Sequence, residues 1–335
     1  MRQIALLAAL IAVSTPGVTV GQPHRSRSPQ FDYIALDAAG ASHAWAAAIN
    51  DRGVVAGTAT VSASTMMGSG FIWTESDGFT TIVENAVVRD INNKAQVVGR
   101  YRCSSEIECA AGFSWTPSTG LEDLGNFSPY AVNNRGDMAG TCGESTPCAI
   151  LGGSLVEIAV DSDFGITFDI NDRGVVAGWM YGPVDVEGGR GPVAFTWSLR
   201  GGLIILDAAD ADNTIANAIN RHGVVAGSVT YNSTIGVGSR VNAVIWMQGQ
   251  PFILHGGDWT TAAAINDRGW TVGFLSVGGS GPNLPMFWIP GQPAVQLPLS
   301  GGTGGFATDI NKSGQIVGYV YTSAGIMQAV LWRPR

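Results

Sequence analysis

The segment DINDRGVVAGWM, at residues 169–180, carries oxygen-bearing side chains at a spacing typical of calcium-binding loops. In such a loop, positions one, three, five and twelve supply carboxylate or amide ligands, and position six is glycine. Positions one, three and six are Asp169, Asn171 and Gly174, but position five is Arg173 and position twelve is Met180. Because two ligands are missing, we expect no metal at this segment.

The same residue types also favour a tight turn. An Asn side chain can accept a hydrogen bond from the backbone N–H two residues ahead, and Gly adopts the left-handed conformation that a Cβ would strain. We therefore interpret I-N-x-x-G-x-V-V as a hairpin whose turn is shaped by Asn171 and Gly174.

This turn is one of seven copies, which indicates a repeat architecture. The copies read AAINDRGVVAG, RDINNKAQVVG, YAVNNRGDMAG, FDINDRGVVAG, NAINRHGVVAG, AAINDRGWTVG and TDINKSGQIVG. Their central asparagines, for which we predict a structural role in the turn, are Asn50, Asn92, Asn133, Asn171, Asn220, Asn266 and Asn311. The second copy has Ala95 in place of Gly, so its turn should be strained or differently shaped. Two residues before each Asn stands Ala or Asp, which suits a crowded inner strand.

A second landmark lies between the copies: an apolar pair that leads to Trp, as in FIWT or FTWS. Only the third repeat lacks this Trp and reads CAILGG. A short turn and a further apolar run follow the landmark. Each repeat therefore holds four short strands, here called strands a to d. Four strands in a little over 40 residues, repeated seven times, predict an all-β fold, a seven-bladed β-propeller of four-stranded blades.

The two ends of the chain fit this prediction. The chain stops after strand c of the seventh repeat, at AVLWRPR, and FDYIALD at residues 31–37 can supply the missing strand d. We expect this N-terminal strand to pair in the last blade and to close the ring, because the pairing removes two exposed sheet edges. The predicted propeller is a single domain over residues 31–335.

The N-terminal segment predicts export. Residues 1–21 hold Arg2, a short apolar run and small residues near Gly21, as a cleavable signal peptide does, and residues 22–30 form a flexible lead-in. No later segment is apolar over the length of a membrane span. We expect a secreted protein, extracellular or periplasmic.

The four cysteines agree with an oxidising compartment. Cys103 and Cys109 enclose five residues, and so do Cys142 and Cys148. We expect two local disulfides, because neither pair has the spacing or the nearby His of a metal site.

Composition and motifs limit the possible activities. The net charge of −8 argues against a general nucleic-acid binder, which needs clustered positive charge. The sequence contains no G-x-S-x-G elbow, phosphate loop or HExxH motif, and no cofactor is expected. The alternative to a noncatalytic module is a hydrolase or lyase that uses carboxylates from different blades. The candidate carboxylates lie between strand d and the next strand a, and they are Asp161, Asp163, Asp207, Asp210 and Asp212.

The connections predict two unlike faces. The a-to-b and c-to-d turns are tight, whereas the b-to-c and d-to-a connections are long and varied and emerge together on the other face. Varied loops on a rigid scaffold often carry binding. The predicted contacts for a sugar or a protein there are Tyr181, Tyr231 and Trp259, with Asp207, Asp210 and Asp212 beside them.

Every a-to-b turn carries a basic residue. These residues are Arg52, Lys94, Arg135, Arg173, Arg221, Arg268 and Lys312. In a closed ring they would encircle one mouth of the channel. They either bind a polyanion, such as an acidic polysaccharide, or are solvated and paired with neighbouring aspartates.

The repeated Ile-Asn-x-x-Gly-x-Val-Val-Gly core, the Trp landmark and the N-terminal Y-x-x-x-D strand resemble the HAF family of extracellular repeats. The resemblance covers about residues 31–335, although the His-Ala-Phe signature appears only as His43-Ala44-Trp45. It implies a secreted repeat protein and supplies no catalytic residue. We expect a monomeric, secreted binding or interaction module whose long-loop face takes a carbohydrate or protein.

Overall fold

The computed structural model describes residues 29–38, 40–62, 67–102, 110–143, 145–158, 164–181, 191–231 and 239–335. The expected signal peptide, most of the lead-in, the expected Cys103–Cys109 disulfide and the candidates Asp161 and Asp163 lie outside these residues. Within the described ranges, no helix has the length and apolar character needed to cross a membrane.

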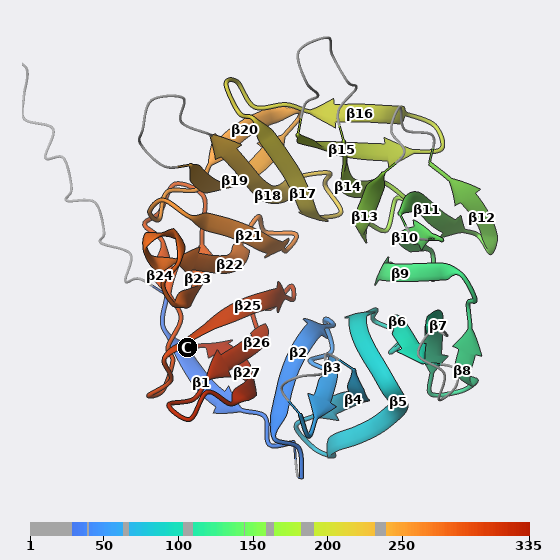
Figure 1. Cartoon of the computed structure of the whole chain (residues 1–335), viewed down its shortest axis with the longest axis vertical. Coiled ribbons are helices and arrows are strands. Elements are labelled where there is room, and N and C mark those ends of the chain that lie inside the picture. The colour runs from blue at the N-terminus through green and yellow to red at the C-terminus, as the bar shows by residue number, and fades with distance from the viewer. Residues whose placement is uncertain are drawn as a thin grey trace, which may run out of the picture.

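The described residues form strands and one short 3-10 helix, η1 (Val277–Gly279), with no α-helix among them. Hydrogen bonds join these strands into six sheets, which Figure 1 shows arranged radially around a common axis. In four of the sheets, four consecutive strands pair antiparallel. The first of these holds β9 (Phe127–Val132), β10 (Met138–Cys142), β11 (Thr146–Leu151) and β12 (Ser154–Glu157). The second holds β13 (Gly165–Ile170), β14 (Val176–Tyr181), β15 (Pro192–Ser198) and β16 (Gly202–Leu206).

Two further sheets repeat this plan. One holds β17 (Asn213–Ile219), β18 (Val225–Tyr231), β19 (Arg240–Met247) and β20 (Gln250–Ile253). The other holds β21 (Thr260–Ile265), β22 (Thr271–Ser276), β23 (Asn283–Trp288) and β24 (Val295–Gln296). In each sheet the first strand ends one residue before a central Asn and lies nearest the axis (Figure 1).

The largest sheet joins two repeats through one long strand. It holds β2 (His43–Ile49), β3 (Val55–Thr60), β4 (Gly68–Thr74), β5 (Gly78–Ile91), β6 (Val97–Arg102), β7 (Ala110–Thr116) and β8 (Gly120–Asp123). The first half of β5 pairs with β4 and the second half pairs with β6. The expectation that every d-to-a connection is long is therefore wrong here, because strand d continues directly into the next strand a.

The sixth sheet unites the two ends of the described chain. It consists of β1 (Phe31–Ala35), β27 (Met327–Pro334), β26 (Ile316–Tyr321) and β25 (Gly304–Ile310). β1 pairs antiparallel with β27, from Phe31 opposite Pro334 to Ala35 opposite Val330. The predicted pairing of FDYIALD with the last Trp strand is present.

A β-bulge in each inner strand explains the second glycine of the motif. The register shifts between the residues four and two places before each central Asn, as between Ala46 and Ala48. This bulge brings a backbone carbonyl against the neighbouring strand, so that a Cβ on Gly57 would lie 2.2 Å from the Trp45 oxygen. Only glycine fits at this close approach. The same obstruction occurs at the equivalent glycines, which are Gly99, Gly140, Gly178, Gly227, Gly273 and Gly318.

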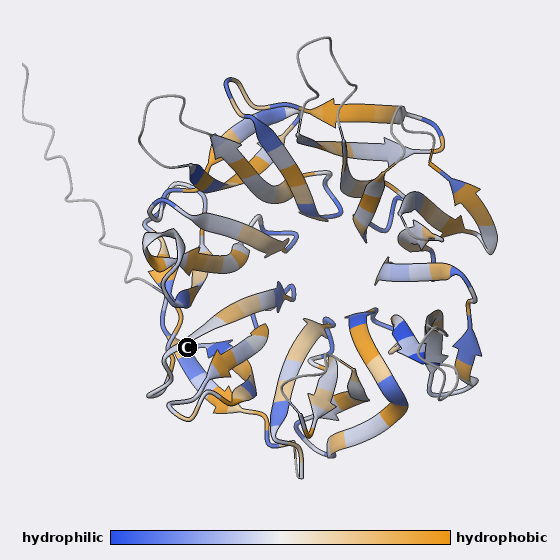
Figure 2. Ribbon diagram, in the orientation of Figure 1, coloured by the Kyte–Doolittle hydropathy of each residue, from blue (hydrophilic) through white to orange (hydrophobic). Residues whose placement is uncertain are grey.

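The core consists of separate apolar clusters that form where neighbouring sheets pack together. In three sheets the landmark tryptophan donates a hydrogen bond to the connection that enters the sheet. The indole N–H of Trp246 donates to the carbonyl of Asp207 at 3.0 Å, and Trp332 donates to Pro298 at 2.8 Å. Figure 2 shows apolar and polar residues interspersed along the strands, and β3 is buried at five of its six residues, as expected where both faces of a sheet pack against neighbouring sheets.

The expected disulfide between Cys142 and Cys148 is confirmed. It joins the end of β10 to β11 across their short connection, with the two Cα atoms 5.8 Å apart. It is therefore a local staple of one hairpin.

Candidate functional site

The central asparagines shape their turns as predicted. In all seven turns the Asn Oδ1 accepts the backbone N–H two residues ahead, at 2.9–3.1 Å. The same oxygen also accepts the N–H four residues ahead. These side chains are only 3–5% exposed, so almost all of their hydrogen-bonding capacity is used inside the protein.

The third residue after each Asn adopts a positive φ. Six of these residues are glycines, and the seventh, Ala95, has φ 58°. Its N–H still donates to the Asn92 carbonyl at 3.0 Å, as the glycine at this place does in the other turns. The Ala95 turn therefore keeps the common shape and is strained, which is one of the two outcomes predicted.

A second set of bonds links the turns to one another. Each central Asn donates through Nδ2 to the backbone carbonyl of the next central Asn, at 2.9–3.1 Å, and Asn311 donates to Asn50. The bonds thus form a circuit that returns to its starting residue. The only sign of these turn-to-turn bonds in the sequence is that the motif recurs with the same internal spacing. Turn chemistry explains the bonds within each turn and does not predict the bonds between turns.

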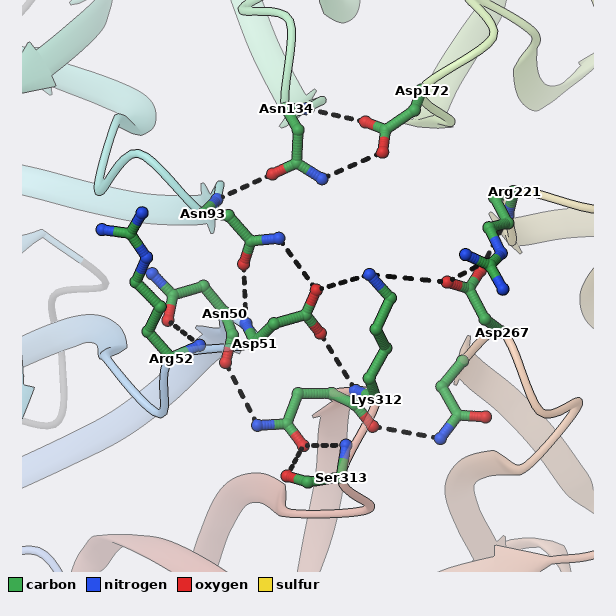
Figure 3. Close-up of polar contacts among 12 residues, drawn as sticks. Asn50, Asp51, Arg52, Asn93, Asn134, Asp172, Arg221, Asp267, Lys312 and Ser313 are labelled. Carbon is green, nitrogen blue, oxygen red and sulfur yellow. Dashed lines mark hydrogen bonds and ion pairs between the residues drawn. The ribbon is translucent and has the colours of Figure 1, made fainter.

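The residue that follows each central Asn lines a pocket of 180 Å³ at the axis. These seven residues are Asp51, Asn93, Asn134, Asp172, Arg221, Asp267 and Lys312. Several of them are linked along the rim in Figure 3, where the backbone N–H groups of Asp51, Asn93 and Asn134 each donate to the side chain of the next residue. With three aspartates against one arginine and one lysine, this rim is not positively charged.

Lys312 lies between two rim carboxylates. Its Nζ is 3.0 Å from Asp51 Oδ2 and 3.9 Å from Asp267 Oδ2, and Arg221 Nε is 3.4 Å from the same Asp267 atom (Figure 3). Burial raises the pKa of the Asp51 carboxyl, but hydrogen bonds from Asn93 and Lys312 outweigh burial and the net pKa is lowered. These two basic residues are therefore paired with aspartates.

The other five predicted basic residues do not line the axial pocket. They stand two places after their Asn and are exposed, and they are Arg52, Lys94, Arg135, Arg173 and Arg268. Arg268 lies over the ring of Trp270 at 4.9 Å, and Arg135 pairs with Asp137. The seven basic side chains thus do not form one ring around the mouth.

Three aspartates face the axis beyond this rim, where the other inner strands carry Ala. Each carboxylate bridges two neighbouring inner strands: Asp169 accepts the N–H of Ile170 through Oδ1 and that of Ile219 through Oδ2, both at 2.7 Å. Asp90 and Asp309 make the equivalent pairs of bonds.

Burial is the main cause of high pKa values in these three carboxyls. The pKa is raised to about 6 for Asp90 and to about 7 for Asp169 and Asp309, and mutual repulsion adds to the rise for the latter two. By surface area the three side chains are only partly buried, because one edge faces the axis. Each carboxylate already accepts two backbone N–H groups, so these residues hold strands together and are poorly placed to attack a substrate.

Tyr181 belongs to a cluster of three aromatic rings at the far end of a hairpin from its Asn turn. Its ring centroid is 5.6 Å from Phe164 and 5.5 Å from Trp179, and those two rings are 5.4 Å apart. Tyr181 is 47% exposed and Phe164 is 36% exposed. The sequence prediction included Tyr181 and missed the other two, although W-M-Y in β14 puts Trp179 and Tyr181 on the same face of the strand.

The other two predicted aromatic contacts lie in different surroundings. Tyr231 is half-buried against an apolar cluster. Burial is the main cause of its raised pKa, and the negative charge of the nearby Asp210 raises the pKa further. Trp259 has φ 69° and packs so closely on the η1 turn that a Cβ on Gly279 would lie 2.7 Å from its ring. Neither residue joins the Phe164–Trp179–Tyr181 cluster in the described part of the chain.

The predicted carboxylates Asp207, Asp210 and Asp212 all lie on one connection, between β16 and β17. All three are exposed. Catalysis by carboxylates from different blades needs side chains that converge from separate connections, and these residues share one. Among the described residues, no group of His, Cys, Asp or Glu could hold a metal ion.

No family model matches the chain, and no curated protein is significantly similar to it. Among solved structures, it is similar to the β-propeller domain of the Trilobed protease from Pyrococcus furiosus, at 12% identity and a TM-score of 0.62. That match covers 87% of this chain and 95% of the other. The chain has a β-propeller fold.

TolB from Acinetobacter baumannii matches the propeller less well, with a TM-score of 0.44 and 12% identity over 81% of this chain and 61% of TolB. The P. furiosus domain is described as having an open velcro topology, whereas this propeller pairs β1 with β27. At such identities the likeness shows the fold alone.

Proposed function

We propose that this protein is a secreted, noncatalytic binding module of the HAF type, built as a closed ring of seven blades, whose aromatic cluster takes a carbohydrate. The observation that carries the proposal is the Phe164–Trp179–Tyr181 cluster on the face of the long connections. Aromatic rings offer large rigid contact surfaces, and exposed aromatic groups on a rigid scaffold commonly form the centre of a binding surface.

Two sets of contacts support the closed ring. The circuit of central asparagines links the last turn to the first through Asn311 and Asn50, and β1 pairs with β27. β5 contributes to two blades at once, so the seven-stranded sheet counts as two blades in this proposal. A ring held in this way presents its long connections on a fixed frame.

The proposed ligand is a sugar because the cluster combines apolar ring faces with a polar edge. The Tyr181 hydroxyl and the Trp179 indole can hydrogen-bond to sugar hydroxyls while their rings pack on the C–H face of a pyranose. Binding by an exposed cluster of this size should be weak for one sugar unit and stronger for a chain that crosses it.

A glycan array followed by titration with the best ligand tests this proposal. The variant Tyr181→Ala should lower affinity at least tenfold, whereas Phe252→Ala should leave it unchanged. Phe252 is the matched control because it is also 47% exposed but lies on the outer strand β20, outside the Phe164–Trp179–Tyr181 cluster. Equal binding by the two variants would contradict the proposal, and turnover of any polymer in a hydrolase and lyase panel would replace it with an enzyme.

Secretion is tested separately. Expression of the full chain in an exporting host should yield a product outside the cytoplasm whose N-terminus follows Gly21 or a residue near it. Recovery of the protein only from the cytoplasm, with residues 1–21 still attached, would contradict this part of the proposal.

A further inference from the structure

A groove on the Asn-turn face carries an unbalanced positive charge. It has a volume of 710 Å³ and lies between the turns of Asn133 and Asn171. Three arginines line it from three separate turns: Arg135, Arg173 and Arg200. One acidic residue, Asp137, lies among the lining residues. The groove therefore holds three guanidinium groups against one carboxylate, in a protein whose net charge is −8.

Asp137 neutralises only one of these arginines. Its carboxylate is buried and accepts two bonds from Arg135, from Nε at 2.9 Å and from Nη2 at 2.5 Å. It also accepts the backbone N–H of Gly152 and the Asn133 side chain. Burial raises the pKa of Asp137, but these donors outweigh burial and the net pKa is lowered, so the residue stays ionised and its acceptors are in use.

Arg135 also reaches across to the neighbouring turn. A Cβ on Gly174 would lie 2.8 Å from Arg135 Nη2, so the Arg135 guanidinium group lies against the backbone next to Arg173. Arg173 and Arg200 are exposed and line the same groove, and within the described part of the chain neither forms an ion pair with a carboxylate. The guanidinium groups of Arg173 and Arg200 thus line the same groove, beside the guanidinium group of Arg135 that Asp137 holds in place. Each guanidinium group can donate paired hydrogen bonds to an oxyanion.

Apolar side chains, together with Ser198 and two glycines, form the remaining walls of the groove. Leu151, Val175 and Leu199 line it, and Leu199 is 66% exposed. A bare inorganic anion would leave these walls and most of the volume unused. A ligand with both an oxyanion and an apolar face fits the whole surface, and a pyranose ring that carries a carboxylate or a sulfate has both.

A second groove occupies the equivalent place between the last and first Asn turns and provides an internal comparison. It has a volume of 500 Å³, and its charged lining residues are Asp51, Arg52, Glu75 and Arg333. Arg333 pairs with Glu75 at 2.8 Å, and the lining residues comprise two arginines and two acidic residues. A groove at this place in the repeat is therefore not positively charged by itself. The positive charge comes from the residues at the Asn133 and Asn171 turns.

We propose that the groove of Arg135, Arg173 and Arg200 is an oxyanion site for an acidic sugar unit of a polysaccharide. Arg173 and Arg200 hold the carboxylate or sulfate through paired N–H donors, and Leu151 and Leu199 contact the ring. This site lies on the opposite face from the Phe164–Trp179–Tyr181 cluster and does not depend on it.

Titration with defined probes at low and physiological salt tests the site. The probes are an oligogalacturonate, a sulfated heparin oligosaccharide, a neutral dextran oligosaccharide and inorganic phosphate. The wild-type protein should bind one or both acidic oligosaccharides, more weakly at higher salt, and should not bind dextran through this groove. The double variant Arg173→Ser/Arg200→Ser should lose at least tenfold in affinity.

The matched control is Arg52→Ser, which removes one exposed arginine from the balanced groove and should change affinity less than twofold. Because all three substituted residues are exposed, circular dichroism and the thermal midpoint should stay close to wild type. Loss of affinity in Arg52→Ser equal to that in the double variant would show general charge attraction and overturn the site. Unchanged binding in the double variant would overturn it too, and phosphate binding as tight as the acidic sugars would overturn the assignment to a sugar.

Discussion

The two faces of this propeller differ in how far their residues are bound to one another. On the Asn-turn face, the same side chain makes the same three backbone bonds in each of seven turns. On the opposite face, Phe164, Trp179 and Tyr181 contact each other, and a second aromatic cluster of Phe306, Tyr319 and Tyr321 lies on the β25–β26 hairpin. The difference teaches that repetition on the Asn-turn face marks construction, whereas the aromatic residues of the opposite face vary from one hairpin to the next.

Loss of one central Asn should have the largest effect. In Asn220→Ala, two backbone N–H groups lose their acceptor and the Asn266 carbonyl loses one of its two donors in a buried site, so the free energy of unfolding should fall by about 3–5 kcal/mol. Urea denaturation measures the change. A loss below about 1 kcal/mol would show that the circuit is not essential to the Asn-turn face.

Removal of the three axial aspartates should change how stability depends on pH. Their pKa values in the folded chain lie above the ordinary value of 3.8, so they favour folding most below pH 4, and this contribution is lost as pH rises through 6 to 7. Because each carboxylate has one edge toward the axis, we expect about 1 kcal/mol per carboxyl.

The variant Asp90→Ala/Asp169→Ala/Asp309→Ala should therefore lose most of the decline in stability between pH 4 and pH 7. Ala is compatible with the site, since Ala218 and Ala264 occupy the same position on neighbouring inner strands. Denaturation at pH 4, 5.5 and 7 tests this, and an unchanged pH slope would contradict the assignment.

Substitutions at the strained Ala95 turn and at an ordinary glycine turn should change the free energy of unfolding in opposite directions. Ala95→Gly relieves a φ of 58° and should raise the free energy of unfolding by about 1 kcal/mol. Gly223→Ala is the reciprocal control, because its φ is 83° and no atom lies within 4 Å of the added Cβ. It should cost about the same amount. Equal signs for the two changes, measured by thermal unfolding, would contradict this explanation.

The smallest effect on stability should come from the aromatic cluster. Tyr181→Ala removes an exposed ring and should change the free energy of unfolding by about 0.5 kcal/mol or less. A loss above about 2 kcal/mol in the same urea assay would show that Tyr181 belongs to the frame and would remove the contrast between the two faces.

The sequence predicted the frame well because its residues obey local rules. Asn171 and Gly174 in the turns, the strand order within a repeat and the pairing of β1 with β27 all follow from turn chemistry and hydrophobic patterning. The bonds from one Asn to the next required knowledge of which turns lie side by side, which no single segment contains.

Other features could not be predicted because they depend on direction in space. The basic residues are evenly placed in the sequence, yet one position decides whether a side chain faces the axis, as Lys312 does, or lies in a groove, as Arg173 does. Of the two partners of Tyr181, Trp179 lies on the same strand, whereas Phe164 precedes β13 and is brought alongside only by the pairing of β13 with β14.

The most direct test of the account concerns closure of the Asn circuit. Asn311→Asp keeps the accepting Oδ1 but replaces the donor toward Asn50 with an oxygen, and Asn92→Asp does the same toward Asn133. Both side chains also donate to a Gln four residues ahead, so the two sites are matched. In urea denaturation the closed circuit predicts equal losses of about 2–3 kcal/mol. A normal loss for Asn92→Asp with a much smaller one for Asn311→Asp would contradict closure.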